Sequence, residues 1–419
     1  MQIINDNMVI FLFGISIFLT IIASLFVPVL VYIGFLLTIL SILILKNKGI
    51  FCILIFIHPM ATIFKVAPGT TSFFTLIEIF AILILSFRVY NFRKEFLLLI
   101  IILIFEIFIN ANGIINIIKL FNIIMIYYLF TVLYKKEDAK YYIICFLASI
   151  LISSLLGAVK DKIPRLISFY ESIIFEVLDG EAVFRFSGIY NDPNYFSVSI
   201  IQGIIVVFSS FINRNIKNRT LFGVIFLLLL FCGSLTISKS FYLLALFVIV
   251  MIMLSSDFNR NFVPIICGIF LIMLVIHINP FGLLNNIFAR FDTYDITTGR
   301  ADIWKVYIAY IFSSVKTFLI GVGIDASYLL ASNHVAHNIY IEVLYHIGII
   351  GFILYFATFA IITNLSDIKI KRCMLNYIGY ICLMIQFFFL NGLTTFDMPF
   401  YLMICYIVFN CDYKNKEMI

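Results

Sequence analysis

The chain has 419 residues, of which 63% are apolar and 12% are Asp, Glu, Lys or Arg, and its net charge is +6. Soluble domains carry about twice that share of charge, so a soluble globular protein is excluded. The 8 cysteines are too sparse for a secreted disulfide scaffold, and continuous apolar runs exclude an outer-membrane barrel, whose strands alternate. The composition predicts an all-α polytopic integral membrane protein, with one transmembrane domain over 1–419.

Apolar runs and polar breaks alternate along the chain and predict about 12–14 transmembrane helices, because one span needs about 20 apolar residues. No basic segment precedes the first run, so we interpret it as a span and not as a cleaved signal peptide. The expected spans lie near 8–27, 29–45, 50–65, 72–87, 96–110, 113–134, 141–158, 194–212, 220–237, 240–254, 262–279, 337–363, 374–393 and 400–411.

The basic residues indicate the orientation. With the N-terminus in the cytoplasm, most of the 28 Lys and Arg residues fall in cytoplasmic breaks, as the positive-inside rule requires. These breaks lie at 46–48, 88–94, 135–140, 214–219, 260, 369–372 and 414–416. We therefore expect both termini to lie in the cytoplasm. The net positive charge belongs to this pattern and does not indicate nucleic-acid binding.

Two polar segments, 159–193 and 280–336, are too long for simple turns and are expected to be large extracytoplasmic loops. Apolar side chains at Ile303, Val306 and Tyr307 recur at helical spacing, and they predict an amphipathic helix over 301–318 at the membrane interface. For the basic cluster Lys160, Lys162 and Arg165 of the first loop, a solvated loop face is the favoured interpretation.

Four charged residues are expected inside spans near their outer ends, namely Glu78, Glu106, Lys119 and Glu342. Charges at that depth are costly and normally line a protein interior or a cavity. Glu106 and Lys119 approach the same outer turn, so a buried ion pair is favoured over a substrate role.

Two motifs flank the spans that follow the first loop. Arg185 precedes Asp192, Pro193 and Asn194, and Pro193 suits the first turn of a helix that Asp192 would cap. A helix N-terminus also favours anions, so these residues are either a plain cap with an adjacent arginine or a binding site. The second motif, Thr-Ile-Ser-Lys-Ser at 236–240, is a tight hairpin whose Lys239 is either solvated or a phosphate ligand.

The second loop carries two further motifs. Arg290 and Arg300 flank a Thr- and Gly-rich turn, and arginine suits phosphate oxygens; Trp304 beside them is typical of an interfacial anchor. The other motif holds the residues His334, His337, Asn338, Tyr340, Glu342 and His346. On one helix His334 and His337 would lie three residues apart, but a zinc site would lack further ligands. His337 is either a structural hydrogen-bonding group or a catalytic one.

A cationic site at the outer leaflet, without paired carboxylates, suits a substrate that already carries a good leaving group. Cations let a lipid-linked pyrophosphate depart without a proton, and a neutral histidine can take the proton of an acceptor hydroxyl. We therefore expect glycosyl transfer that needs no metal and no cofactor.

In order, these motifs resemble the O-antigen polymerase and O-antigen ligase superfamily of bacterial inner-membrane glycosyltransferases. The resemblance covers 180–355 by motif and the whole chain by span pattern. It implies a lipopolysaccharide or polysaccharide polymerase that joins undecaprenyl-pyrophosphate-linked oligosaccharide repeat units at the outer face. The implied partners are that glycolipid, the bilayer, a chain-length regulator and a flippase.

The resemblance also implies roles for single residues. Arg290, Arg300 and His337 would be catalytic, the arginines at the pyrophosphate and the histidine at the acceptor hydroxyl. The substrate would be bound by Arg185, Asp192, Asn194, Lys239, His334, Asn338, Tyr340 and Glu342. Lys239 stands where relatives often have arginine.

Two other functions remain open from the sequence. A ligase of the same superfamily would transfer the finished polymer to the lipid A core. A transporter or flippase for lipid-linked sugars would need a polar pathway through both membrane halves, whereas the embedded charges lie on the outer side alone.

Overall fold

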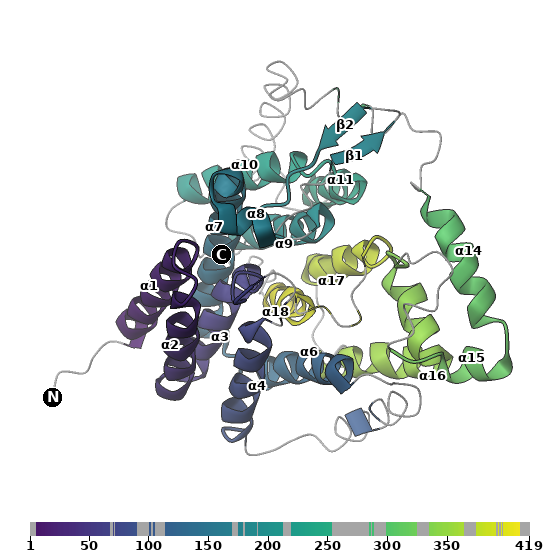
Figure 1. Ribbon diagram of the computed structural model, residues 1–419, viewed down its shortest axis with the longest axis horizontal. Coiled ribbons are helices and arrows are strands. Elements are labelled where there is room, and N and C mark those ends of the chain that lie inside the picture. Colours follow the sequence, from purple (N-terminus) through teal and green to yellow (C-terminus); the bar gives the residue numbers. More distant parts are fainter. Residues whose placement is uncertain are drawn as a thin grey trace, which may run out of the picture.

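The computed structural model (Figure 1) describes most of the chain. The described residues are 6–67, 72–89, 114–169, 175–178, 181–190, 192–212, 219–253, 299–324, 335–363, 374–390 and 397–410, with a few isolated positions. In the N-terminal half, the helices are α1 (Asp6–Ser24), α2 (Leu30–Ile44), α3 (Asn47–Ile57), α4 (Phe73–Ser86), α6 (Ile114–Leu133), α7 (Ala139–Val159) and α8 (Pro164–Phe169). They are followed by α9 (Pro193–Ile212), α10 (Arg219–Ser234), α11 (Lys239–Met253), α14 (Arg300–Ile311), α15 (Val315–Ile320), α16 (Ile339–Ile362), α17 (Met374–Gln386) and α18 (Met398–Phe409).

The described part of the chain is predominantly helical, as the composition predicted. Five helices are long and apolar enough to cross a membrane, and seven apolar helices are shorter, with 10–17 residues. Every predicted span except two contains a described helix. The two exceptions, 96–110 and 262–279, lie almost entirely outside the described residues.

A two-stranded hairpin interrupts the helical pattern inside the predicted first loop. Strand β1 (Phe175–Leu178) pairs antiparallel with β2 (Glu181–Phe184), and Phe175 lies opposite Phe184. The expectation of an all-α chain is therefore correct for the spans but not for this segment. In Figure 1 the hairpin projects from the end of the molecule where α9, α10 and α11 meet.

Contacts between helix ends support the predicted alternation of spans. The helix ends predicted to be extracytoplasmic form what we call the loop side. The helix ends predicted to be cytoplasmic form the basic side. On the loop side, the Ile339 amide donates to the Phe387 carbonyl at 2.8 Å, which joins the start of α16 to the end of α17. On the basic side, the Asn376 amide nitrogen donates to the Phe409 carbonyl at 2.9 Å. Both bonds join ends that the alternation places together.

A polar pocket of about 730 Å³ opens on the basic side. Its lining includes Lys46 and Lys48 before α3, Arg88 after α4 and Lys135 after α6. These cations come from three separate breaks in the sequence, yet they surround one space. Three of the seven predicted basic breaks thus share one side of the molecule, and the orientation of that side stays a prediction.

The core is built around α9 and α18, which lie at the centre of Figure 1 and are buried along most of their length. In a membrane protein an apolar helix can also face lipid, as α1 does with only 17% of its span buried, so burial and not composition marks these two helices as central. The polar side chains of α9 are therefore enclosed too, and Ser197, Ser199 and Gln202 have no exposed surface. The N-terminus of α9 opens on the loop side, where the candidate site lies.

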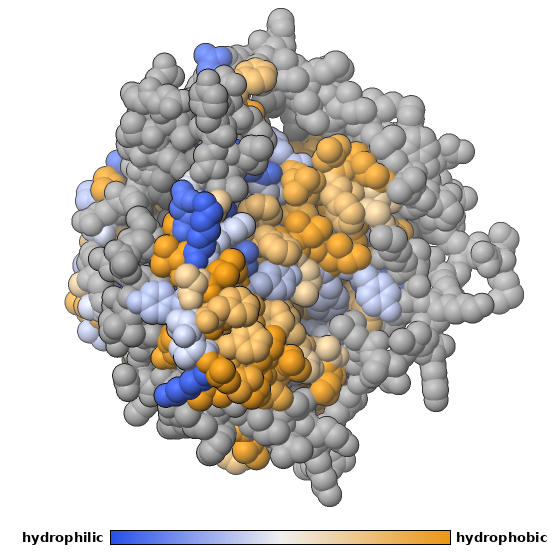
Figure 2. Space-filling model, turned by 90° about the vertical axis from the view of Figure 1, so that its right-hand side faces the viewer, coloured by the Kyte–Doolittle hydropathy of each residue, from blue (hydrophilic) through white to orange (hydrophobic). Residues whose placement is uncertain are grey.

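The predicted amphipathic helix over 301–318 is two helices, α14 and α15. The chain breaks at 312–314, where the Ser314 and Thr317 side chains form a capping box that starts α15. Apolar side chains such as Ile308, Phe312 and Val315 are exposed along this pair. Figure 2 shows this side of the molecule as largely apolar with separate hydrophilic patches, which suits contact with lipid.

Close backbone packing fixes α15 against α16. Gly348 has a φ of 65° inside α16 and produces a kink there, and a Cβ at this position would collide with the backbone of Leu319. Gly321 has a φ of 76° and lies equally close to the carbonyl of His346. Glycine is required at both positions because each combines a positive φ with direct backbone contact.

The basic cluster of the first loop is not a solvated face, contrary to the favoured interpretation. Lys160 is only 2% exposed, and Lys162 alone is exposed. The Arg165 guanidinium donates to the carbonyls of Ser24 at 2.6 Å and Lys65 at 2.7 Å. Carbonyls at helix ends lack partners within the helix, so an arginine that reaches two of them ties separate loop-side connections together.

Candidate functional site

Arg185 is at the centre of the first group of predicted site residues. It follows β2 directly, and the next amide, of Phe186, donates to the Leu235 carbonyl at 3.0 Å, which holds the segment against the turn after α10. The Arg185 side chain is buried, and its Nε donates to the Thr236 carbonyl at 3.1 Å while Nη2 donates to Asn194 Oδ1 at 3.1 Å. Arg185 therefore connects the start of α9 with the α10–α11 turn.

Hydroxyl groups of the 236–240 hairpin complete this group. Ser238 Oγ donates to Asn194 Oδ1 at 3.0 Å and lies 2.8 Å from Ser240 Oγ. Both serines are buried, and Lys239 between them is half-buried as the first residue of α11. The structure thus brings together two motifs that lie more than forty residues apart in the sequence. We call Arg185, Asn194, Ser238, Lys239 and Ser240 the arginine cluster.

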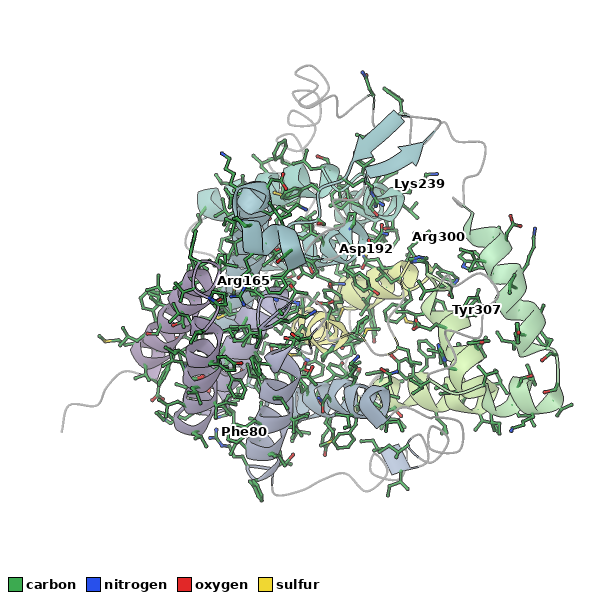
Figure 3. The ribbon with its side chains drawn as sticks, viewed as in Figure 1. Phe80, Arg165, Asp192, Lys239, Arg300 and Tyr307 are labelled. Atoms are coloured by element: carbon green, nitrogen blue, oxygen red, sulfur yellow. The ribbon has the colours of Figure 1, made fainter. Side chains whose placement is uncertain are left out.

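Asp192 has the capping role that the sequence predicted. Its Oδ1 accepts a hydrogen bond from the Asn194 amide at 2.6 Å, and Pro193 is the first residue of α9. Asp192 and Lys239 are labelled in the upper part of Figure 3, beside α9 and α11. The helix N-terminus therefore opens beside the arginine cluster, and this arrangement favours an anion.

A second group lies where α14 meets the start of α16. Arg300 is the first residue of α14, after Gly299 with a φ of 79°. One turn later, Trp304 Nε1 donates to the Ala336 carbonyl at 2.7 Å, and the Tyr307 ring packs edge-on against Tyr345 at 4.8 Å. Arg300 and His337 therefore lie on segments that are in direct contact. Trp304 has a hydrogen-bonding role within the protein in addition to any role at the interface.

Glu342 faces this same contact. Burial raises the pKa of Tyr307 above its usual range, and the nearby Tyr345 and Glu342 raise it further. Glu342 lies in the first turn of α16, where a negative charge also suits the helix dipole. Figure 3 shows Arg300 and Tyr307 along α14, on the side of the molecule that faces α16.

His337 is not helical, although the predicted span 337–363 begins at this residue. Its φ is 48°, in the left-handed region that residues other than glycine seldom adopt. Helix α16 begins only at Ile339. The physical reason is the cap that follows it, because Asn338 Oδ1 accepts from the Tyr340 and Ile341 amides at 3.0 and 3.2 Å. An N-cap residue leaves the helical conformation, and the chain before it turns away.

The remaining predicted residues divide into two sets. Tyr340 is half-buried, and its hydroxyl donates to the Met384 carbonyl at 2.8 Å, so it ties α16 to α17. Arg290, His334 and Glu106 lie outside the described residues. The predicted pair of Glu106 with Lys119 therefore stays a prediction.

A buried polar cluster beneath the arginine cluster was not predicted. His58 has no exposed surface, and its Nε2 lies 3.5 Å from Asp397 Oδ1 and 3.5 Å from the Tyr190 hydroxyl. Burial raises the pKa of Asp397 to about 8. The signal in the sequence was a single histidine inside an apolar run and a single aspartate at the edge of another, since isolated ionisable groups in spans mark functional or cavity positions.

No family model, no curated protein and no solved structure matches the chain. The chemistry of the site therefore comes from its residues. The arginine cluster combines a guanidinium, hydroxyl groups and a lysine at a helix N-terminus, which are the kinds of group that bind phosphate oxygens. In this structure Arg185 Nε and Nη2 and the Ser238 hydroxyl donate to protein oxygens. Such an arrangement can hold a phosphorylated ligand at the loop side of the helices.

Proposed function

We propose that this protein is a glycosyltransferase that joins undecaprenyl-pyrophosphate-linked oligosaccharide repeat units, that is, an O-antigen or polysaccharide polymerase. The proposal includes twelve to fourteen spans in the bacterial inner membrane and cytoplasmic termini. The loop side then faces away from the cytoplasm, and both large loops lie there. A flippase would supply the substrate, and a chain-length regulator would limit the product.

The arginine cluster is the observation that carries this proposal. A buried arginine and a lysine from two separate motifs meet at the N-terminus of a central helix, on the side opposite the basic breaks. The cost of burying Arg185 is offset by its bonds to the Thr236 carbonyl and Asn194. Positive charge placed this way acts in a low dielectric, where it stabilises a departing anion more than a solvated charge does.

The reaction balances without a further reactant. The bond between the anomeric carbon of the donor glycan and the pyrophosphate oxygen breaks, and the electron pair leaves with the undecaprenyl pyrophosphate. A hydroxyl of the acceptor repeat unit forms the new bond to that carbon and loses its proton to a base, for which His337 is the candidate. Arg185, Lys239 and Arg300, together with Arg290, would neutralise the leaving group.

The His337 assignment has support in the local structure. The residue is half-buried next to Ala336, which binds Trp304 of α14. Its positive φ holds the imidazole out of the helix that begins two residues later. Strained backbone at a single polar residue is more frequent at functional sites than elsewhere.

The test is the lipid-linked glycan profile of the producing cell. With Arg185→Ala, single repeat units should accumulate on the carrier while long chains disappear, whereas Lys46→Ala, on the basic side, should leave the profile unchanged. Arg185→Lys should retain part of the activity, because it keeps the charge but not the fork of donors. Long carrier-linked polymer in Arg185→Ala would indicate a ligase, and unchanged long chains at normal expression would contradict both functions.

A further inference from the structure

The buried cluster around His58 forms a chain of hydrogen bonds whose direction can be derived. His58 Nδ1 lies 3.3 Å from the Ile55 carbonyl. A carbonyl only accepts, so Nδ1 carries the proton, and Nε2 of the neutral ring is an acceptor. The ring is held in this orientation by stacking on Phe400 at 4.5 Å. Nε2 therefore needs a donor from the side of Asp397 and Tyr190.

Asp397 can supply that donor only when it is protonated. Its carboxyl group is enclosed, with 7% of the side chain exposed, and among the described residues its Oδ1 makes no hydrogen bond. An ionised carboxylate would place an acceptor opposite the acceptor nitrogen of His58, at 3.5 Å in a dry environment. Glu78, also buried, interacts electrostatically with Asp397 and adds a like charge when both are ionised. The pair is therefore stable when it shares a proton.

Tyr190 connects this pair with the arginine cluster. The Ser199 hydroxyl donates to the Tyr190 oxygen at 2.8 Å, and the Tyr190 hydroxyl lies 3.5 Å from His58 Nε2, which can accept from it when Nδ1 holds the ring proton. Tyr401, the other titratable group of the cluster, donates to the Tyr195 carbonyl at 3.0 Å and so does not supply His58. Tyr190 thus competes with Asp397 for the same nitrogen.

The stretch of chain that follows Arg185 is also held by contacts with α7. Gly188, with a φ of 57°, packs directly on Gly157 of α7, and the Ile189 amide donates to Ser153 Oγ at 3.3 Å. Only four residues lie between Arg185 and Tyr190, so a change in the Tyr190 hydrogen bond acts on the arginine through a short, anchored stretch of backbone.

We propose that His58 and Asp397 hold one proton between them and that, through Tyr190, this pair positions the 185–194 segment for anion binding. His58 and Asp397 are positioning residues, since they act through Tyr190 and not on the substrate. The part of this proposal that concerns anion binding rests on the proposed function, whereas the shared proton does not.

The binding test uses the full chain in detergent and farnesyl pyrophosphate as the probe, by calorimetry between pH 6.5 and 9.5. In the wild type, affinity should fall about three- to tenfold as the pH passes 8, the size expected for one hydrogen bond. Asp397→Asn places a permanent donor opposite His58, so its affinity should be independent of pH. Tyr190→Phe should remove the same pH dependence, because it breaks the connection.

The matched control is His346→Gln. His346 is also buried, and its Nδ1 lies 2.6 Å from the Gly323 carbonyl, away from the 185–194 segment, so its pH dependence should equal that of the wild type. The same pH dependence in wild type, Asp397→Asn and Tyr190→Phe would overturn the positioning role. Where Asp397→Asn does not fold, Tyr190→Phe decides the question.

Nitrogen NMR of histidine-labelled protein separates this proposal from the proposed function. The His58 signals are assigned by their loss in His58→Gln, and the Nε2 signal should move in Asp397→Asn and in Tyr190→Phe. An Nε2 signal that is the same in all three proteins would overturn the shared proton. If the wild type binds no farnesyl pyrophosphate, the proposed anion site fails, and the NMR result still decides whether the pair holds a proton.

Discussion

The loop side and the basic side of the molecule both gather positive charge, but they hold it in different ways. Arg185 on the loop side is 5% exposed, and its guanidinium bonds to oxygens of Thr236 and Asn194 inside the protein. Lys46 on the basic side has 80% of its side chain exposed and pairs with Asp6 at 2.7 Å. The first charge is enclosed by neighbours from two motifs, whereas the second is solvated next to a carboxylate.

This difference distinguishes charge that orients the chain from charge that can act on a ligand. Exposed pairs contribute little free energy and are screened by salt. A buried cation is costly, and it is retained where its surroundings are built for it. Positive charge is therefore enclosed by protein groups on the loop side and solvated on the basic side.

The largest expected effect comes from Asn194→Ala. Asn194 Oδ1 accepts from both Arg185 and Ser238, so the change leaves two buried donors unsatisfied, one of them charged. We expect the free energy of unfolding to fall by roughly 3 kcal/mol, and polymer formation by purified protein to fall because Arg185 is no longer held in place. Lys46→Ala should change activity and stability by less than about 0.5 kcal/mol. Equal effects of Asn194→Ala and Lys46→Ala would contradict the distinction between enclosed charge on the loop side and solvated charge on the basic side.

A change behind the arginine cluster should have the next largest effect. In Gly157→Ala the new Cβ would collide with the backbone of Gly188, and crowding of this kind costs about 1–3 kcal/mol. Gly223→Ala in α10 is the matched control, because no described atom beyond the neighbouring backbone of its own helix lies within 4 Å of its Cβ position. We expect a lower thermal midpoint and weaker pyrophosphate binding in Gly157→Ala alone. Normal binding in that variant would show that Gly188 need not be fixed.

Asp397 should give the chain a pH-dependent stability. Because burial raises its pKa to about 8 from 3.8, the folded state keeps a proton that the unfolded state releases above pH 3.8. The free energy of unfolding should therefore fall as pH rises from about 4 to about 8, by about 1.4 kcal/mol per pH unit at most, and then level off.

The measurement is the thermal midpoint in detergent at pH 6 and pH 8.5. Asp397→Asn should lose most of the difference between the two midpoints, because the amide does not titrate. Asp302→Asn is the control, since Asp302 is exposed and its ion pair among the described residues is with Lys305 of its own helix. An unchanged difference in Asp397→Asn would show that another group is responsible.

Whether a feature of this molecule could be predicted from the sequence depends on how far apart along the chain its interacting residues lie. The spans follow from local hydropathy, and the cap at Asp192 follows from a short motif, so both were predictable. The break in 301–318 has a local signal too, in Ser314 and Thr317, but the apolar periodicity continues through it. For Arg185, Asn194 and Ser238, the sequence predicted only that they lie on the same side of the membrane. It did not predict that their side chains are hydrogen-bonded to one another.

The His58 cluster could not be predicted in the same way. Its members come from four separate segments, and their partnership depends on how α3, α4, α9 and α18 pack against each other. Span alternation places His58 and Asp397 on the loop side but gives no information on which helices are neighbours. The kink at Gly348 likewise depends on contact with Leu319 of α15, which lies outside its own helix.

The smallest expected effect concerns Asn338, which the sequence assigned to substrate binding and which the structure uses as the N-cap of α16. Asn338→Ala should lower stability by about 1 kcal/mol, the usual cost of a lost cap, and Asn338→Asp should restore it, because aspartate caps equally well. A role limited to capping predicts that polymer length follows stability, so that Asn338→Asp is normal in both. Normal stability with shortened polymer in Asn338→Asp would instead indicate that the amide contacts the substrate, since a carboxylate there would repel a pyrophosphate.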